Sequence, residues 1–246
     1  MKVFFNNEIK KKYDEVFASR PFIFEKSFDV KGEPHLGFTP EFMLVVAMHK
    51  WESFIQQRGD IYLDLLWEFY AHIITKDSPF LMIRGTCVRF EVDHVNNMFN
   101  LSCEDDGHEN FASSLTATKR SKIVADLRVD GTQWVVAPKG SRSIKRVTLK
   151  NQARGWNHFL KATLMSISHN DTISEEHMAL LHSIITRRKI IVGRIIVNEA
   201  FKCIEMGNTN LLFLLLITNL CFWHKVPKLT SDKALAVKGT LVLPAT

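Results

Sequence analysis

Apolar residues recur at helical spacing along much of the chain. From Glu41 to Gln57 no Gly or Pro interrupts a pattern in which apolar positions lie three or four residues apart. This pattern predicts a helix that ends before Gly59. The next segment carries an apolar residue at every fourth position, which predicts a second helix with one buried stripe. That stripe consists of Ile61, Leu65, Phe69 and Ile73.

Four more helices are predicted in the C-terminal half. Thr148 stands where its side chain could cap the first of them. Thr172 and Glu175 have the spacing of a capping box ahead of the second. The predicted helices run through residues 149–164, 175–185, 191–206 and 211–224, and Gly207-Asn208 separates the last two.

Strand signals are sparse. Residues 80–90 alternate in polarity around Gly85, which predicts a β-hairpin, and residues 133–137 read as a short strand. We therefore predict a mainly α protein: a multi-helix globular domain, in one or two lobes, with one or two small β-hairpins. The predicted parts are an N-terminal extension (1–19), a helical domain (20–226) with any lobe boundary near 105–145, and a loose C-terminal tail (227–246).

The composition places the chain among ordinary globular proteins. Of its 246 residues 46% are hydrophobic and 24% charged. The longest apolar run, from Leu211 to Trp223, is well short of the roughly 20 residues that span a bilayer, so it predicts a buried helix. The first residues turn polar too early for a secretory signal. Four widely spaced Cys indicate thiols, mostly buried, in a reducing compartment. We expect an intracellular protein, cytoplasmic or nuclear, that is not secreted.

Several short patches along the chain resemble one family in their order and spacing. They begin at Arg20-x-Phe22-Ile23-x-Glu25-Lys26-x-Phe28 and Trp51-x-x-Phe54. They continue with Tyr62-x-x-Leu65-x-x-Glu68-Phe69-Tyr70, Ile83-Arg84-Gly85-x-x-Val88-x-Phe90 and Val95-Asn96. The last are Leu149-x-x-x-Ala153-Arg154-x-Trp156-x-x-Phe159-Leu160, Val192-Gly193-Arg194-Ile195-Ile196 and Leu216-Ile217-Thr218-x-Leu220-Cys221.

Together these patches resemble the putative plant transposon protein domain family, over about residues 20–226. Leu214 departs from the family pattern, which has Pro at that position. The family occurs in plant retrotransposon open reading frames, and some members are labelled envelope-like. It has no established activity, so the resemblance implies an origin in a retrotransposon and a structural module, without a mechanism.

No motif in the sequence predicts catalysis or metal binding. A transposase needs three carboxylates that hold two Mg²⁺ ions on a strand-rich core, and strand signal is sparse here. Cys221-x-x-His224 has ligand-like spacing, but it has no second close pair and lies at the end of an apolar helix. His177 and His182 lie five residues apart, which does not place them on one helix face, and we expect both to be solvated or half-buried.

Phosphate-binding loops and nucleophile elbows are also missing from the sequence. Gly193, at the start of a predicted helix, is explained by close packing or by an N-terminal turn. We therefore predict no catalytic, metal-binding or cofactor-binding residue, no cofactor, and a protein that is not an enzyme. The alternative is an enzyme whose site is assembled only by the fold.

Positive charge is concentrated in one segment. The chain has a formal net charge of +6, and residues 119–154 contain ten Lys and Arg against two acidic residues. Basic side chains there could neutralise phosphates, and Trp134 could stack on a base. The predicted contact residues are Trp134, Lys139, Arg142, Lys145, Arg146, Lys150 and Arg154. The alternative is a solvated basic face with Trp134 in the core.

The sequence thus predicts a retrotransposon-derived, non-enzymatic protein that acts by binding or assembly. Its candidate partners are RNA or single-stranded DNA, contacted through residues 119–154, other proteins, or a second copy of the chain. We also predict that Trp51 and Trp156, which lie on helical apolar stripes in different halves of the chain, are core anchors.

Overall fold

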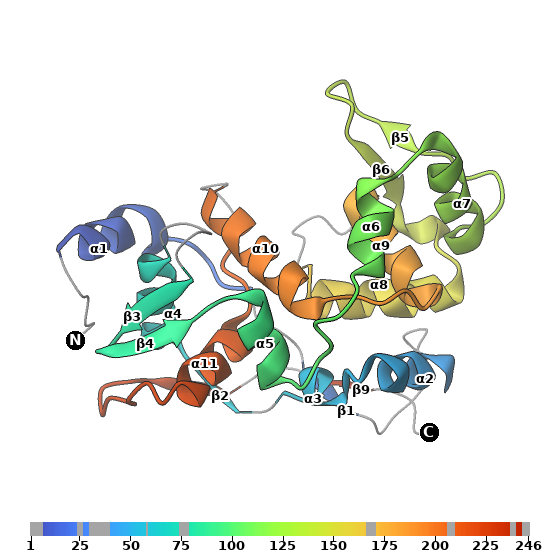
Figure 1. Ribbon diagram of the computed structural model, residues 1–246. Coiled ribbons are helices and arrows are strands. Elements are labelled where there is room, and N and C mark those ends of the chain that lie inside the picture. Colours follow the sequence, from blue (N-terminus) through green and yellow to red (C-terminus); the bar gives the residue numbers. More distant parts are fainter. Residues whose placement is uncertain are drawn as a thin grey trace. The chain divides into compact units, whose positions relative to one another are not determined.

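The computed structural model describes residues 7–23, 27–29, 40–57, 59–73, 79–165, 171–205, 210–236 and 240–242. Over these residues the protein is mainly α, and its sheets have two or three strands, which confirms the predicted fold class (Figure 1). The chain forms two compact units. Unit 1 comprises Met1–Phe28, Ser53–Leu101 and Val192–Leu241, and unit 2 comprises Asp29–Glu52, Ser102–Ile191 and Val242–Thr246.

Unit 1 contains helices from three separate stretches of the chain. Its helical elements are α1 (Asn7–Lys12), η1 (Tyr13–Phe17), α3 (Glu52–Ile55), α4 (Leu63–His72), α5 (Val92–Met98), α10 (Val192–Glu205) and α11 (Leu214–Trp223). Its strands are β2 (Asp60–Tyr62), β3 (Phe80–Ile83), β4 (Thr86–Arg89) and β8 (Ala234–Ala236). The pair β1 (Ser27–Asp29) and β9 (Thr240–Val242) lies at the boundaries of the two units.

The core of unit 1 forms around α4 and α11. The predicted stripe Ile61, Leu65, Phe69 and Ile73 is buried, although Ile61 lies in β2 rather than in the helix. The predicted burial of α11 is also confirmed. Tyr70 joins the two helical regions, since its hydroxyl donates to the carbonyl oxygen of Leu212 at 2.5 Å.

The predicted hairpin is confirmed as β3 and β4. Leu81, Ile83 and Val88 are buried, and the strands are joined by a two-residue turn. Both turn residues have positive φ, 50° at Arg84 and 76° at Gly85. That conformation matches the right-handed twist of the flanking strands and explains the glycine.

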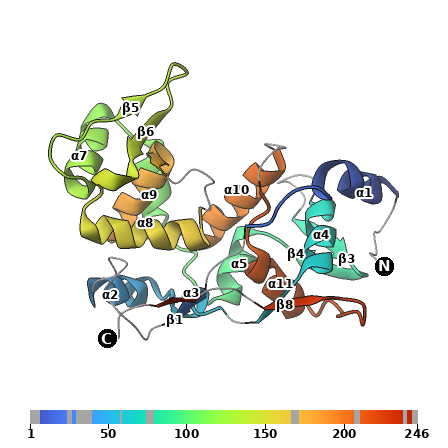
Figure 2. The same cartoon turned by 180° about the vertical axis from the view of Figure 1, so that it is seen from behind.

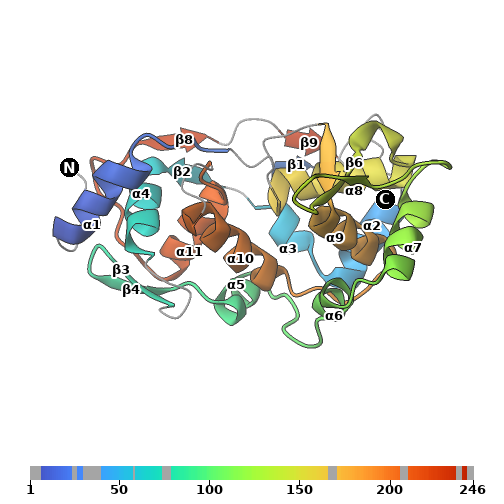
Figure 3. The same cartoon turned by 90° about the horizontal axis from the view of Figure 1, so that it is seen from above.

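A buried ion cluster holds this hairpin to the rest of unit 1. Arg84 Nη2 lies 3.1 Å from Glu68 Oε1, and Arg84 Nη1 lies 2.6 Å from Asp232 Oδ2. The three side chains are at most 3% exposed. Asp232 belongs to the segment predicted as a loose tail. Strand β8 of that segment (Figure 2) pairs antiparallel with β2, beside which it lies in Figure 3. Residues 227–236 are thus attached to unit 1 by an ion pair and a strand pairing, although none of these residues is buried as a whole.

Helices α5 and α10 approach closely at Gly193. The amide of Gly193 donates to Asn96 Oδ1 at 2.8 Å. A Cβ at Gly193 would lie 2.5 Å from the carbonyl oxygen of Val92 and 2.8 Å from that Oδ1 atom. Of the two predicted explanations for this glycine, close packing is the one that the structure supports.

Replacing Gly193 by Ala should therefore destabilise the protein by about 1–3 kcal/mol, because backbone must move to admit the methyl group. Gly107→Ala is the matched control, since a Cβ there would meet Lys189 at an ordinary 3.5 Å. Urea denaturation of both variants measures the difference. Equal stability of the two variants would show that α10 can shift away from α5 without cost.

Unit 2 is built around α9, which packs against α6, α7 and α8 (Figure 3). Its helical elements are α2 (Pro40–His49), α6 (Gly107–Ser113), α7 (Ala117–Leu127), η3 (Arg146–Thr148), α8 (Asn151–Thr163) and α9 (Glu175–Ile185). Its three-stranded antiparallel sheet has the order β5 (Val135–Val136), β6 (Arg142–Lys145), β7 (Thr172–Ser174). The chain enters this part of unit 2 after Leu101 and leaves it after Ile191.

Aromatic rings fill the core of unit 2. Phe42 stacks on Trp156 with ring centroids 3.9 Å apart, and Trp51 stacks on Phe159 at 6.0 Å. Both tryptophans are 1% exposed, which confirms them as core anchors. Although they come from different halves of the sequence, they lie in one core, with their ring centroids 6.3 Å apart.

Several helix boundaries and caps differ from the prediction. The helix expected over residues 41–57 is broken, because α2 ends at His49 and Lys50 adopts φ 56°, which leaves Trp51 between α2 and α3. The N-cap of α9 is Ser174, whose Oγ accepts from the amide of His177, and not Thr172. Thr148 does not cap α8, because its hydroxyl donates to the carbonyl oxygen of Lys145. Gly207-Asn208 and most of residues 24–39 lie outside the described residues.

The cysteines divide evenly between interior and surface. Cys203 and Cys221 are buried, but Cys87 and Cys103 are exposed, so the expectation of mostly buried thiols is wrong for half of them. Cys87 is exposed because it lies on the outer face of the hairpin, opposite Met82. None of the helices in the described part of the chain is long and apolar enough to cross a membrane.

Candidate nucleic-acid interface

The basic segment, residues 119–154, lies within unit 2 and runs through five of its helices and strands. It starts in α7, continues through a turn into β5 and β6, and ends in η3 and the first turn of α8. Strand β6 is the middle strand of the sheet, with Ser143 opposite Ser174 and Lys145 opposite Thr172. The segment is therefore carried by ordered secondary structure along most of its length.

One of the two acidic residues of the segment is occupied by structural contacts. Asp126 Oδ2 lies 2.8 Å from His182 Nε2 and 3.1 Å from Lys122 Nζ. Burial raises the pKa of Asp126, but hydrogen bonds from His182 and Lys122 outweigh it, so the pKa is lower than usual. Asp130 is exposed beyond the end of α7. The negative charge of Asp126 thus neutralises the charge of Lys122 and not that of a residue predicted to bind phosphate.

Glu175, at the start of α9, neutralises part of the basic segment. Its carboxylate lies 2.9 Å from Arg120 Nη2 and 3.6 Å from Arg142 Nη1. Arg142 is thus the predicted contact residue that has an acidic partner. No local sequence pattern indicates this pairing, because Glu175 reaches α7 and β6 only through the packing of α9.

Three of the predicted residues, Lys139, Lys145 and Arg146, are exposed and have no ion-pair partner in the described part of the chain. Two others are held by backbone carbonyls: Lys150 Nζ donates to Ala125 O at 2.7 Å, and Arg154 Nε to Leu149 O at 3.0 Å. A carbonyl orients a cation without cancelling its charge. Five of the six predicted cations therefore keep an uncompensated positive charge.

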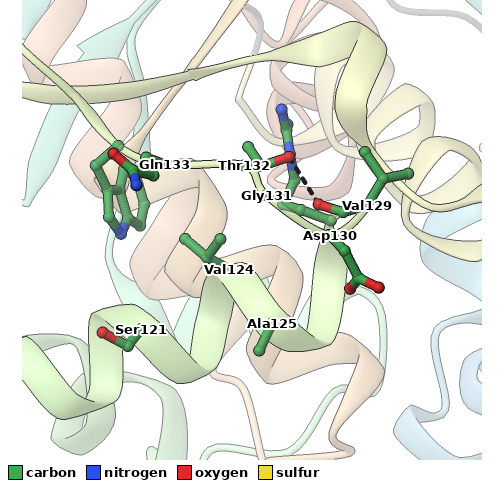
Figure 4. A pocket seen from close by; sticks show the side chains of 10 residues that line it. Ser121, Val124, Ala125, Val129, Asp130, Gly131, Thr132 and Gln133 are labelled. Carbon is green, nitrogen blue, oxygen red and sulfur yellow. Dashed lines mark hydrogen bonds between the residues drawn. The ribbon is translucent and has the colours of Figure 1, made fainter.

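Trp134 lies neither in the core nor fully in solvent. It is half-buried, and its Nε1–H donates to the carbonyl oxygen of Arg120 at 3.3 Å. Its side chain lines a pocket of about 350 Å³. Figure 4 shows this pocket between α7 and the returning segment that carries Thr132 and Gln133. The alternative of a core tryptophan is wrong, because the turn after α7 folds back along the helix and leaves this ring at the pocket.

The pocket also contains a residue that the sequence prediction passed over. Arg128 is 1% exposed and lines the same cavity as Trp134. In the sequence it is only one of ten basic residues, and nothing in its immediate neighbours marks it as buried. A backbone bridge from Arg128 to Leu149 fixes it in place, a contact between segments that local patterns do not reveal.

The histidines and cysteines weighed as metal ligands have other surroundings. His177 and His182 are fully buried, so the expectation of solvated or half-buried rings is wrong, because α9 is enclosed by three helices. Burial, and to a lesser extent Lys161, lowers the pKa of His177 to about 3, so this ring is neutral. Cys221 is buried and its thiol pKa is raised by desolvation. Over the described ranges, no three His, Cys, Asp or Glu side chains are grouped to hold a metal ion.

The residues that resemble a known family meet in the structure as packing contacts. Glu68 binds Arg84, Asn96 accepts from the amide of Gly193, and Trp156 contacts Phe159. The shared patches therefore specify the cores of both units. These features define the class as a mainly helical protein of two compact units.

The chain belongs to the family described as putative plant retrotransposon-related domain, whose model matches residues 47–227. This match confirms the resemblance and identifies the chain as retrotransposon-related. No curated protein matches the chain. No solved structure matches it.

Proposed function

We propose that this protein is a non-enzymatic binding protein whose unit 2 contacts single-stranded nucleic acid through the basic segment. The observation that carries the proposal is the exposure of Lys139, Lys145 and Arg146 without acidic partners in the described part of the chain. Exposed cations without acidic partners favour the binding of a nucleic acid, because each contact with a phosphate releases a counterion that was condensed on the nucleic acid.

Four acidic side chains of the described residues support the non-enzymatic part of the proposal. Glu68 and Asp232 are committed to Arg84, Asp126 to His182 and Lys122, and Glu175 to two arginines. Carboxylates that already neutralise neighbouring cations are poorly placed to bind a catalytic metal ion. They are explained by the stability of the two units.

Trp134 favours single strands over duplex. A half-buried indole beside basic residues offers a stacking face to an unpaired base, which a duplex keeps inside its own stack. RNA is the first ligand to test, because the family is related to retrotransposons.

Binding of a single-stranded RNA should weaken linearly in log–log terms as salt rises. Contacts by the five predicted cations without an acidic partner in the described part of the chain would give a slope near −3.5, at about −0.7 per contact. Charge reversal of Lys139, Lys145 and Arg146 to Glu should make the slope shallower by about 2 and remove most of the affinity. Arg142 is left unchanged in this variant, because a glutamate there would face Glu175. Fluorescence anisotropy across a salt series measures both quantities.

The matched control reverses three exposed lysines outside residues 119–154, Lys50, Lys225 and Lys233, to Glu. It changes the net charge by the same amount and should leave most of the affinity in place. Equal losses in the two variants would mean that binding follows net charge alone. Absence of salt-sensitive binding by the unchanged protein at micromolar concentration would contradict the proposal.

A further inference from the structure

One face of α7 and the chain that follows it enclose the pocket. Ser121, Val124 and Ala125 line it at i, i+3 and i+4, the spacing of one helical face, and Arg128, the extended residue that follows the helix, lines it as well. The chain then turns at Asp130-Gly131 and runs back, and Trp134 reaches Arg120 near the start of that face. Figure 4 shows Val124 and Ala125 on the helix, with Thr132 and Gln133 on the returning segment across from them.

Arg128 is an incompletely satisfied cation in this pocket. Its Nη2 donates to the carbonyl oxygen of Lys145, but Nε and Nη1 are buried and have no hydrogen-bond partner among the described residues. No carboxylate of the described chain pairs with it. Burial lowers its pKa to about 10, so the guanidinium is still charged at neutral pH.

A buried charge without a partner is costly, and buried cations in proteins are normally paired. Nε carries one N–H and Nη1 carries two, so several donors of one guanidinium lack an acceptor. A phosphate supplies both the negative charge and several acceptor oxygens, and it is a group that arginine binds with high geometric specificity. The guanidinium of Arg128 therefore has the chemistry of a phosphate site.

The pocket has room for more than the anion. Its volume of about 350 Å³ is larger than a phosphate needs and is within the range of small-molecule sites. The remaining space adjoins the indole of Trp134 and the aliphatic side chain of Val124. An aromatic face beside a phosphate-binding cation suits a nucleobase joined to that phosphate.

We infer that this pocket binds one nucleotide, with the phosphate on Nε and Nη1 of Arg128 and the base against Trp134. The inference rests on the proposed function, because it assigns one nucleotide of the bound strand to this pocket. Both nitrogens are buried, so binding requires a local movement that exposes them to the pocket.

Adenosine 5′-monophosphate is the first probe, and titration calorimetry on the full chain measures its binding. It should bind more tightly than inorganic phosphate, and adenosine should bind least, because it lacks the anion. Arg128→Met should weaken the binding by about tenfold or more, the loss expected for a charge-assisted hydrogen-bonded pair. The same variant should melt at an unchanged or higher temperature, because it removes an unpaired buried charge and Thr148 still donates to Lys145 O.

Two further variants test the assignment without altering Arg128. Asp130→Asn should tighten binding about twofold, since the exposed carboxylate beside the pocket repels a phosphate. Trp134→Leu should weaken binding of the nucleotide and leave that of inorganic phosphate unchanged. Equal affinity for adenosine and its monophosphate, or no effect of Arg128→Met on binding, would overturn the inference.

The outcomes also separate this inference from the proposed function. If the RNA binds and the Lys139, Lys145 and Arg146 reversal weakens it, but the mononucleotide does not bind, the pocket assignment fails alone. If the mononucleotide binds through Arg128 but no RNA binds at low salt, the proposed function fails and the pocket remains a nucleotide site.

Discussion

Replacing Arg84 by Met is expected to lower the free energy of unfolding by about 3–5 kcal/mol, enough to unfold a marginal domain. Arg84 is 3% exposed and bridges Glu68 and Asp232, which are 0% and 2% exposed. Without the guanidinium, two carboxylates would remain buried close together with no cation between them. Urea denaturation at neutral pH measures the loss.

Arg89→Met is the matched control. Arg89 lies on the same hairpin and is 48% exposed, with its guanidinium 4.0 Å from the Glu91 carboxylate and 5.0 Å from the centroid of the exposed Phe80 ring. Its removal should therefore change stability by less than about 1 kcal/mol. Equal losses at the two positions would show that the cluster contributes no more than a surface ion pair.

The effect of Arg84→Met should also shrink in acid. Burial raises the pKa of Asp232, but hydrogen bonds from Arg84 and from the Leu229 amide outweigh it and set the pKa below its usual value. A carboxylate with a lowered folded-state pKa stabilises the protein above its unfolded pKa, near 3.9, and that contribution is lost as the pH falls through the folded value. The unchanged protein thus loses this contribution at low pH, whereas the variant has none to lose.

Local patterns predicted most helices and the hairpin because these depend on neighbours in the chain. The stripe from Ile61 to Ile73 and the apolar run before Trp223 were recognisable by period and length. The break at Lys50 was not, because Lys has no special preference for positive φ. The contact between Asp232 and Arg84 could not be predicted either, since the two residues are 148 positions apart in the sequence.

The candidate site was predictable only as a concentration of charge. Composition identified residues 119–154, but it could not show that Glu175 neutralises Arg142 or that Arg128 is buried. Both facts depend on contacts with residues outside the local segment, through α9 and through the bridge to Leu149. A count of basic residues gives the sign of a surface, while pairing decides which cations remain to bind a ligand.

Replacing Trp156 by Ala should cost about 3–5 kcal/mol, the usual range for truncating a buried aromatic residue. The Trp156 side chain is 1% exposed. Its ring centroid lies 3.9 Å from that of Phe42, 5.4 Å from that of Phe159 and 6.3 Å from that of Trp51. Its removal would leave a cavity among rings that are already close-packed, and rigid aromatic groups cannot collapse into it easily. Chemical denaturation should show the loss as a lower midpoint.

Trp223→Ala gives the comparison for Trp156→Ala, because Trp223 is 48% exposed at the end of α11. Truncation there removes less buried area and should cost less than about 1 kcal/mol. Trp51→Ala should resemble Trp156→Ala, although Trp51 lies outside any helix, because burial rather than helix membership sets the cost. A soluble Trp156→Ala protein with an unchanged denaturation midpoint would show that the aromatic cluster of unit 2 does not support its fold.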